Sequence, residues 1–217
     1  MKPVLKYCGN RSMQDVKTTV ASNGEYLGFV FAESKRRVEA DDVAEWLKVV
    51  PVHGKKIVAL FVNERIEEIE KVVKKAPIDI IQCHGSESPE EVKAIKERCK
   101  LPVWKAIHHS KTAIDAMKSY EGIVDGFIID SKVKGQWGGT GQTFDWSHIP
   151  AYIEEGKRQG VLVFIAGGIT PENVSGLLSY KPAGIDISSG IESEEQKNAE
   201  RISQIEMRVN QHGHDIS

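Results

Sequence analysis

The chain is poor in cysteine, has no long apolar run and carries almost no net charge. Its three cysteines, Cys8, Cys83 and Cys99, stand far apart and form no Cys-x-x-Cys pair. A disulfide framework and a cysteine-based zinc site are therefore not expected, and a reducing cytoplasm is the expected location. The longest clean apolar stretch, Ile57–Val62, is far too short to span a bilayer, and the first ten residues lack the apolar centre of a signal peptide. We therefore expect no contact with membranes.

Charge and composition narrow the class of partner. Lysine and arginine number 29 against 31 aspartates and glutamates, which gives a net charge of −2, and no basic block is present. Such a chain is not expected to bind nucleic acid, because recognition of a phosphate backbone needs a concentrated positive patch. A hydrophobic content of 40% with 28% charged residues is ordinary for a soluble globular protein. The expected partner is a small-molecule substrate.

Nothing in the sequence reads as a linker or a low-complexity tract. At 217 residues the chain is long enough for one sizeable core and short for two ordinary domains. We therefore expect a single domain over residues 1–217, as a monomer or a homodimer. The final segment, 210–217, carries two histidines and little apolar character, so we expect it to fray.

Eight short apolar runs recur along the chain, and stretches with helical character separate most of them. Strands that alternate with helices pair in parallel, because a parallel strand needs a crossover of a dozen or more residues before the next one. Eight such units predict a single (β/α)8 barrel of the TIM type, whose active site lies at the carboxyl ends of the strands. The runs are Val4–Cys8, Tyr26–Phe31, Ile57–Asn63, Ile78–His84, Val103–Ile107, Val124–Asp130, Val161–Ala166 and Ala183–Ser188.

The helices between the runs are visible in their caps and periodicity. Ser12 is placed to cap a helix that ends near residue 22, and Ser88 is followed by a proline and, three residues on, by a glutamate. Thr170 begins a similar cap-and-proline pattern, and Glu194–Val209 is predicted as the last amphipathic helix. The longest gap between runs, Ser131–Gly160, has the length typical of a functional loop.

Side-chain alternation along the runs constrains two charged residues. Lys6 and Cys8 share one face of the first run, and Asp186 and Ser188 share one face of the eighth. Both faces of a barrel strand are expected to be apolar, since helices cover one and the core fills the other. If the faces of Lys6 and Asp186 point inward, the two side chains meet near the mouth. In the outward orientation both charges would be buried under the helices without partners, which costs free energy.

Chemically capable residues end four of the runs. Cys8 ends the first and is interpreted as a nucleophile, a proton acceptor or a small core residue. Asp130 ends the sixth, where packing alone does not explain a carboxylate and the alternative is a cap of the next turn. Gly167-Gly168 and Ser188-Ser189-Gly190 follow the seventh and eighth runs, where many barrels bind a phosphate against backbone N–H groups. Together these turns favour a phosphorylated ligand.

Two further runs end in residues suited to substrate contact. Arg36 and Arg37 follow the second run, where a guanidinium is either a solvated loop residue or a bidentate clamp for a substrate carboxylate. Gln82 and His84 share one face of the fourth run, so His84 is either a hydrogen-bonded rim residue or a substrate contact. Cys83, between them, is expected to point toward the helices and to belong to the core.

A series of short motifs, in a fixed order, covers most of the chain from Lys6 to Glu192. In that order they closely resemble the phosphoribosylanthranilate isomerases of tryptophan biosynthesis. The matching pieces are Lys6-Tyr7-Cys8-Gly9, Gly28-Phe29-Val30-Phe31 with Ser34-Lys35-Arg36, Phe61-Val62-Asn63, Gln82-Cys83-His84-Gly85, Asp130, Gly138-Gly139-Thr140-Gly141 with Phe144-Asp145-Trp146, Ala166-Gly167-Gly168-Ile169, and Gly184-Ile185-Asp186-Ile187-Ser188-Ser189-Gly190-Ile191-Glu192.

The resemblance implies a cofactor-free Amadori rearrangement of N-(5'-phosphoribosyl)anthranilate, an aminoaldose, to the corresponding aminoketose. It implies that Cys8 is the general base and Asp130 the general acid. An unperturbed thiol titrates near about 8.5, so a base that works near neutral pH benefits from a lowered pKa. A lowered pKa of Cys8 is expected to come either from the cationic Lys6, on the same strand face, or from the iminium cation of the reaction itself.

The resemblance also implies binding roles. Arg36 matches the residue that holds the anthranilate carboxylate. The loop looks one residue shorter than in some relatives, which leaves Arg37 as the alternative, and the Ser-Lys-Arg order favours Arg36. The turns Gly167-Gly168 and Ser188-Ser189-Gly190 match the phosphate site, and Asp186 matches a carboxylate near the sugar.

Two other classes of function are alternatives. A different phosphate-binding barrel enzyme would use a Schiff-base lysine, for which Lys105 in the fifth run is the candidate, or a metal, against which the lack of a convincing His/Asp ligand set argues. The indole-forming synthase of the same pathway is a related barrel that resembles the chain less at Cys8 and Asp130. A non-catalytic phospholigand-binding protein is the second class, because fold alone does not fix function.

Overall fold

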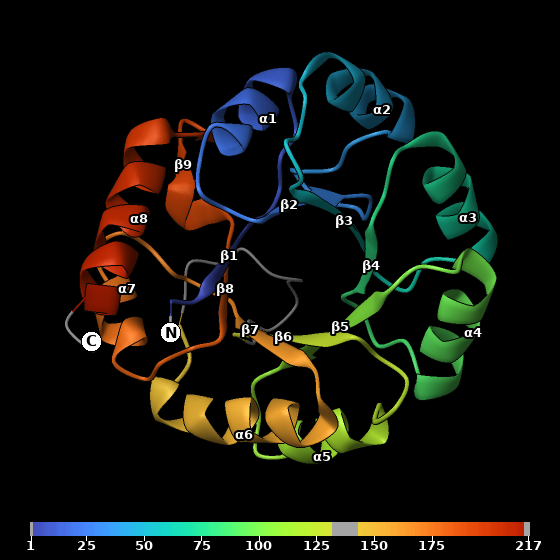
Figure 1. Ribbon diagram of the computed structural model, residues 1–217. Coiled ribbons are helices and arrows are strands. Elements are labelled where there is room, and N and C mark those ends of the chain that lie inside the picture. The colour runs from blue at the N-terminus through green and yellow to red at the C-terminus, as the bar shows by residue number, and fades with distance from the viewer. Residues whose placement is uncertain (1, 132–142, 215–217) are drawn as a thin grey trace.

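The computed structural model describes residues 2–131 and 143–214, except for the side chains of residues 213 and 214. Its eight long strands form a closed barrel in chain order, and each strand pairs in parallel with its neighbours, β8 closing on β1. Figure 1 looks down the barrel, with the helices arranged as an outer ring. The predicted (β/α)8 barrel is therefore confirmed.

The barrel strands coincide with the apolar runs of the sequence. They are β1 (Val4–Tyr7), β2 (Tyr26–Val30), β3 (Lys56–Phe61), β4 (Ile80–Cys83), β5 (Val103–His108), β6 (Gly126–Asp130), β7 (Leu162–Ile165) and β8 (Gly184–Ile187). The helices are α1 (Met13–Val20), α2 (Ala40–Val49), α3 (Ile66–Lys75), α4 (Pro89–Cys99), α5 (Ala113–Ser119), α6 (Ile149–Gln159), α7 (Val174–Leu178) and α8 (Ala199–His214), with short 3-10 turns η1 (Trp146–His148) and η2 (Ser189–Ile191).

Local sequence signals set two of the helix starts. The Ser12 hydroxyl accepts a hydrogen bond from the Asp15 backbone N–H at the start of α1, as predicted. Ser88 and Glu91 form a reciprocal capping box at the start of α4, with a proline at the first helical position. Each cap gives a partner to N–H groups that the helix itself leaves unpaired. These signals act over four residues, so they are legible in the sequence.

The chain after β7 and β8 departs from the predicted helices. The cap-and-proline pattern at Thr170 leads into a turn, and α7 begins only at Val174. The last helix begins at Ala199, because residues 192–197 form a small antiparallel hairpin in which β9 (Glu192–Ser193) pairs with β10 (Gln196–Lys197). The two residues of the hairpin turn have positive φ angles of 49° and 63°, which an α-helix does not accommodate. At its other end α8 continues to residue 214, five residues into the segment for which fraying is expected.

Side-chain alternation divides the buried residues into an outer and an inner layer. The outer layer, between strands and helices, includes Leu5, Tyr7 and Cys83, so Cys83 points toward the helices as predicted. Inside the barrel, a lower cluster around Trp104 and Phe164 is apolar, and a small cluster at the mouth contains Cys8 with Val30 and Leu60. The floor of the barrel is thus filled, which leaves the carboxyl ends of the strands as the place for chemistry.

Candidate active site

One pocket opens at the carboxyl ends of the barrel strands and gathers side chains from strands far apart in the sequence. Of the ten residues predicted for the site, nine line it. The lining residues are Cys8, Val30, Ala32, Glu33, Ser34, Arg36, Leu60, Val62, His84, Asp130, Ala166, Gly167, Gly168, Ile169, Asp186, Ile187, Ser188 and Ser189. The pocket combines an apolar wall from β2 and β3 with polar groups from the other strands, which suits a ligand with one aromatic and one polar part.

Gly190 is the predicted residue that does not line the pocket. It is buried behind the wall, where a Cβ would overlap the backbone carbonyl of Ile169. The absence of a side chain therefore lets the turn after β8 pack directly against the turn after β7. Gly190 shapes the predicted phosphate turns through packing, and its carbonyl oxygen accepts a hydrogen bond from Arg201 Nε.

Lys6 and Asp186 point into the barrel and meet, as the inward alternative requires. Their Nζ and Oδ2 atoms are 2.8 Å apart, and Lys6 is fully buried. The other carboxylate oxygen, Oδ1, has no hydrogen-bond partner among the described residues, although Asp186 lines the pocket. Burial alone would lower the pKa of Lys6, but Asp186 and Cys8 together raise it, so the ammonium stays charged.

The expectation that Lys6 brings the pKa of Cys8 below its ordinary value is wrong. Burial raises the pKa of the Cys8 thiol, and this effect outweighs the opposing field of Lys6, while Asp186 raises it further and Lys197 lowers it. The thiol is buried within the small mouth cluster, where the charged form loses hydration. Lys6 lowers the pKa of Cys8, as expected, but its effect is smaller than that of burial. The resting side chain is therefore a neutral thiol.

Asp130 lies in a buried chain of three polar side chains. His84 Nε2 is 3.2 Å from Asp130 Oδ2, and His84 Nδ1 is 2.8 Å from Gln82 Nε2. Because the Gln82 amide nitrogen can only donate, Nδ1 is the acceptor and Nε2 carries the proton that faces Asp130. Asp130 Oδ1 has no hydrogen-bond partner among the described residues and is directed at the glycine turn after β7.

The turn after β7 requires glycine next to Asp130. Gly167 has a φ angle of +89°, and a Cβ there would overlap Ser131 Oγ and approach Asp130 Oδ1. Gly168 follows with a φ angle of +63°. Glycine thus brings the backbone of the predicted phosphate turn against the predicted acid, so the two sites lie side by side.

The two candidate arginines point in different directions. Arg36 lines the pocket, and its Nε and Nη2 atoms each donate to the Glu192 carboxylate over 2.8 Å. Its side chain is 11% exposed. Arg37 is 52% exposed, pairs with Glu39 and lines a separate surface hollow above α2 and α3. Arg36 is thus the arginine within reach of a ligand in the pocket.

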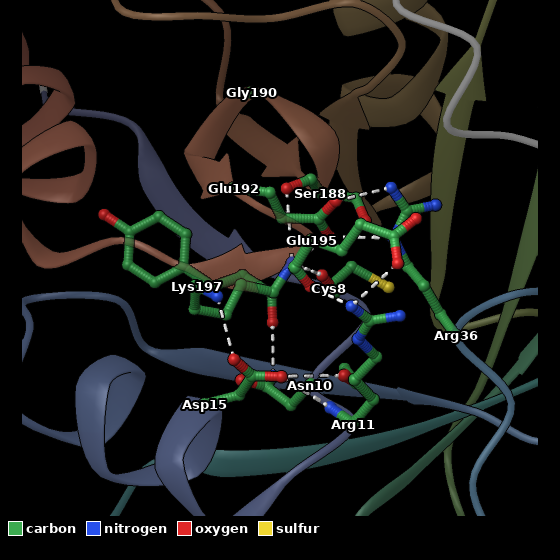
Figure 2. A network of polar contacts seen from close by, with 12 residues as sticks. Cys8, Asn10, Arg11, Asp15, Arg36, Ser188, Gly190, Glu192, Glu195 and Lys197 are labelled. Atoms are coloured by element: carbon green, nitrogen blue, oxygen red, sulfur yellow. Dashed lines mark hydrogen bonds and ion pairs between the residues drawn. The ribbon is translucent and has the colours of Figure 1, made fainter.

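Sequence reasoning missed the group behind Arg36. Glu192 was matched only as part of a motif, and Lys197 falls in the segment predicted as helix. In the structure Lys197 is almost completely buried, with its Nζ atom 2.8 Å from Glu192 Oε1 (Figure 2). The two consecutive glutamates before it favour helix, and no local signal marks a hairpin.

The structure argues against the Schiff-base alternative. Lys105 points away from the barrel interior, because its neighbours Trp104 and Ala106 belong to the inner cluster. Its Nζ atom donates to the carbonyl of Gly85 over 2.7 Å and pairs with Glu87 over 3.0 Å, under the helices. It therefore does not reach the pocket.

Other features of the described residues bear on the remaining alternatives. Over residues 2–131 and 143–214 there is no group of three or more His, Cys, Asp or Glu side chains with the geometry to hold a metal ion. Nor does the described part of the chain contain a helix long and apolar enough to span a membrane. The motif Gly138-Gly139-Thr140-Gly141 lies outside the described residues.

Comparison with known proteins agrees with this geometry. The family model for N-(5'-phosphoribosyl)anthranilate isomerase matches residues 5–208. The N-(5'-phosphoribosyl)anthranilate isomerase of Halalkalibacterium halodurans is 58% identical over 209 residues, which cover 96% of each chain. That of Geobacillus thermodenitrificans is 50% identical over 208 residues, 96% of this chain and 94% of its own.

Solved structures agree with the sequence comparison. Phosphoribosyl anthranilate isomerase from Thermotoga maritima superposes with a TM-score of 0.83 at 28% identity, over 96% of this chain and 99% of the other. A phosphoribosyl anthranilate isomerase in complex with reduced 1-(o-carboxyphenylamino)-1-deoxyribulose 5-phosphate superposes with a TM-score of 0.80 at 27% identity, with the same coverage. The chain therefore belongs to the N-(5'-phosphoribosyl)anthranilate isomerase family.

Proposed function

We propose that the protein converts N-(5'-phosphoribosyl)anthranilate into 1-(2-carboxyphenylamino)-1-deoxyribulose 5-phosphate, a step of tryptophan biosynthesis. The observation that carries the proposal is that a thiol and a carboxyl, from Cys8 and Asp130, line one pocket together with two glycine turns. An aldose-to-ketose rearrangement needs one group that gives a proton and one that takes a proton, on either side of the same carbon skeleton. Family membership supplies the substrate class.

In the proposed mechanism Asp130 gives its proton to the ring oxygen of the ribose. The ring C1–O bond breaks, and the nitrogen lone pair forms an iminium cation with C1. Cys8 then removes the proton from C2, and the electron pair of that C–H bond forms the enolamine. Gain of a proton at C1 and loss of one from the 2-hydroxyl produce the ketone, so protons balance overall. His84 donates a hydrogen bond to the Asp130 carboxylate that remains after the first step.

The resting state of Cys8 fits this order of events. Burial raises the pKa of the free thiol, so the base is neutral before substrate arrives. Formation of the iminium places a positive charge in the pocket, and an opposite charge nearby favours the thiolate. Lys6, whose Nζ atom lies 2.8 Å from Asp186 Oδ2, also favours the thiolate. Deprotonation of Cys8 is thus coupled to the step that makes the C2 hydrogen acidic.

The binding roles follow from the charge of the lining groups. Arg36 is the proposed partner of the anthranilate carboxylate, because it is the arginine of the loop that faces the pocket. The turns Gly167-Gly168 and Ser188-Ser189 are proposed to hold the phosphate through backbone N–H groups. Asp186 lines the pocket, and its Oδ1 atom, which has no partner among the described residues, is proposed to accept a hydrogen bond from a sugar hydroxyl.

Loss of the substrate's fluorescence on mixing with freshly prepared phosphoribosylanthranilate tests the proposal directly. We expect rapid turnover by the unaltered protein, and a fall in kcat of about a hundredfold or more for Cys8→Ser and for Asp130→Asn. Substrate that binds but is not converted by the unaltered protein would favour a non-catalytic binding protein instead. Circular dichroism of each variant provides the control for folding.

The two arginine variants test the carboxylate clamp. Arg36→Ala should raise KM by about tenfold or more, because a charge-assisted hydrogen bond is lost. Arg37→Ala, on the outer side of the loop, should leave KM within about twofold, as expected for an exposed ion pair. The reverse pattern would transfer the role to Arg37.

A further inference from the structure

We propose that Lys197 is a positioning residue for substrate recognition, which acts through Glu192 to fix the orientation and the net charge of Arg36. This inference rests on the proposed function and adds to it a pair of residues that do not line the pocket. Figure 2 shows Lys197, Glu192 and Arg36 within one network of polar contacts, in which Glu192 pairs with both cations.

Contacts on three sides hold the Lys197 ammonium in place. Its Nζ atom donates to the carbonyl oxygen of Cys8 over 2.6 Å, to the carbonyl oxygen of Ser188 over 3.2 Å and to Glu192 Oε1 over 2.8 Å. These contacts use all three donors of the ammonium group. The two carbonyls belong to the loops after β1 and β8, which are adjacent strands. Lys197 is therefore anchored to the rigid edge of the barrel.

The backbone of the hairpin is anchored as well. The Lys197 N–H donates to Asp15 Oδ1 over 2.8 Å, and Asp15 Oδ2 accepts the Arg11 N–H over 3.0 Å. This links β10 to the start of α1, so neither end of the lysine is free to move. Because its other partners are fixed, Lys197 also fixes the position of the Glu192 carboxylate, which its Nζ atom contacts.

Glu192 in turn fixes the guanidinium of Arg36. The carboxylate receives Arg36 through Nε and Nη2, a parallel two-bond geometry that sets the plane of the group. The aliphatic part of Arg36 packs on Gly9, whose φ angle is +77° and where a Cβ would overlap it. Arg36 thus has a defined orientation, and its Nη1 atom, for which the described part of the chain provides no partner, is directed to a ligand carboxylate in the proposed role.

Charge gives Lys197 a second role. Arg36 and Glu192 alone would form a neutral pair, which attracts a carboxylate weakly. Lys197 adds a second cation, so two cations share one carboxylate and the group keeps one net positive charge. Arg36 and Lys197 also hold the Glu192 pKa at about 2 against the opposing effect of burial, so the carboxylate stays ionised. Recognition of the anthranilate carboxylate therefore depends on a lysine outside the pocket.

A pair of ligands separates this role from a purely structural one. The first is reduced 1-(o-carboxyphenylamino)-1-deoxyribulose 5-phosphate, and the second is the same compound without the ring carboxyl. Titration calorimetry measures the affinity for each ligand. We expect Lys197→Met to lower the affinity for the carboxylated ligand by about tenfold more than the affinity for the other, because only the carboxylated ligand uses Arg36. Equal losses for both ligands, or no loss for either, would overturn the proposal.

Glu192→Gln keeps the proposal testable if Lys197→Met does not fold. The glutamine leaves both cations charged but removes one acceptor from the Arg36 fork. This change alters both the orientation and the net charge of the group, so we expect it to change the affinity ratio of the two ligands, because only the carboxylated ligand uses Arg36. An unchanged ratio would overturn the proposal. In an Arg36→Met background the effect of Glu192→Gln on this ligand should vanish. Its persistence there would show that Glu192 does not act through Arg36.

Glu195→Gln is the matched control in the same hairpin. Glu195 is 59% exposed and pairs with Lys35 and Arg11 at the surface, so its loss should leave the affinity ratio of the two ligands unchanged. Turnover of phosphoribosylanthranilate by the unaltered protein is measured alongside. Failure of turnover would reject the proposed function, whereas an unchanged affinity ratio in Lys197→Met would reject only the role of Lys197.

Discussion

Two buried lysine–carboxylate pairs lie on opposite faces of the same sheet. Lys6 pairs with Asp186 inside the barrel over 2.8 Å, and Lys105 pairs with Glu87 under the helices over 3.0 Å. Both lysines are at most 2% exposed. The outer ammonium also donates to backbone carbonyls, including that of Gly85, and Glu87 accepts the Gly85 N–H. The inner pair has fewer protein partners, and one carboxylate oxygen of Asp186 has none among the described residues.

The difference shows how one kind of ion pair serves two purposes. Every polar atom of the outer pair has a protein partner, and several of these partners lie in the loop after β4, so the pair contributes to structure. The inner pair lies beside a thiol and has one acceptor without a partner in the described part of the chain, and its burial makes charges act strongly. A buried charge whose hydrogen-bonding capacity is not used up by the protein is available to a substrate.

Removal of the inner lysine should have the largest effect on catalysis. Lys6→Met leaves Asp186 uncompensated beside Cys8, which opposes formation of the thiolate, so kcat should fall by about a hundredfold or more. Steady-state kinetics on phosphoribosylanthranilate measure this. The control is Lys6→Met with Asp186→Asn, which removes the uncompensated charge and should fold better. An unchanged kcat in Lys6→Met would end the functional distinction between the two pairs.

Removal of the outer lysine should act mainly on stability. Lys105→Met leaves Glu87 buried without its cation, and the free energy of unfolding should fall by about 3–5 kcal/mol. Denaturant unfolding followed by circular dichroism measures the change. Lys105→Met with Glu87→Gln should recover part of the loss, because no unpaired charge remains buried. A variant with full stability and a damaged kcat would reverse the assignment of the two pairs.

The two lysines should also differ in their effect on the pH dependence of Cys8 alkylation, and this difference should be smaller than those in kcat and stability. Burial disfavours the Cys8 thiolate, so iodoacetamide should react with Cys8 with a midpoint above the ordinary thiol value of about 8.5. Lys6 opposes this shift, so Lys6→Met should move the midpoint higher still, while Lys105→Met should not move it. Burial raises the pKa of Cys83 to about 12, so Cys83 should react far more slowly. Peptide mass spectrometry resolves the sites, and a midpoint below the ordinary value would contradict the electrostatic account.

The smallest expected effect concerns two neighbours in β4. Gln82→Leu removes the hydrogen bond that sets the His84 tautomer, and kcat should fall by about fivefold, as for the loss of one hydrogen bond. Cys83→Ala, on the outer face, should leave kcat of the folded protein within about twofold. Steady-state kinetics of the two variants, measured in parallel, compare their kcat values. Equal effects on kcat would mean that the strand face does not separate catalysis from packing.

Much of the site was legible in the sequence because its residues follow local rules. Cys8, His84 and Asp130 stand at the ends of apolar runs, and alternation along each strand assigns them to the inner face. The glycine turns after β7 and β8 are visible for the same reason. The direction of the Cys8 pKa shift was not legible, because the shift depends on how deeply the barrel buries the thiol. Neither was Lys197, because two glutamates in the hairpin turn mimic the start of a helix.

The alternation of strands and helices, the caps of α1 and α4 and the side chains that face inward can be predicted from the amino-acid sequence, since each depends on a periodicity or a contact within a few residues. Only the tertiary structure shows that Arg36 of the loop after β2 faces the pocket and that Glu192 and Lys197 hold it there. Glu192 and Arg36 are separated by 156 positions in the chain, and Lys6 and Asp186 by 180. Interactions between charges depend on distance and burial, and only closure of β8 against β1 sets these for residues so far apart.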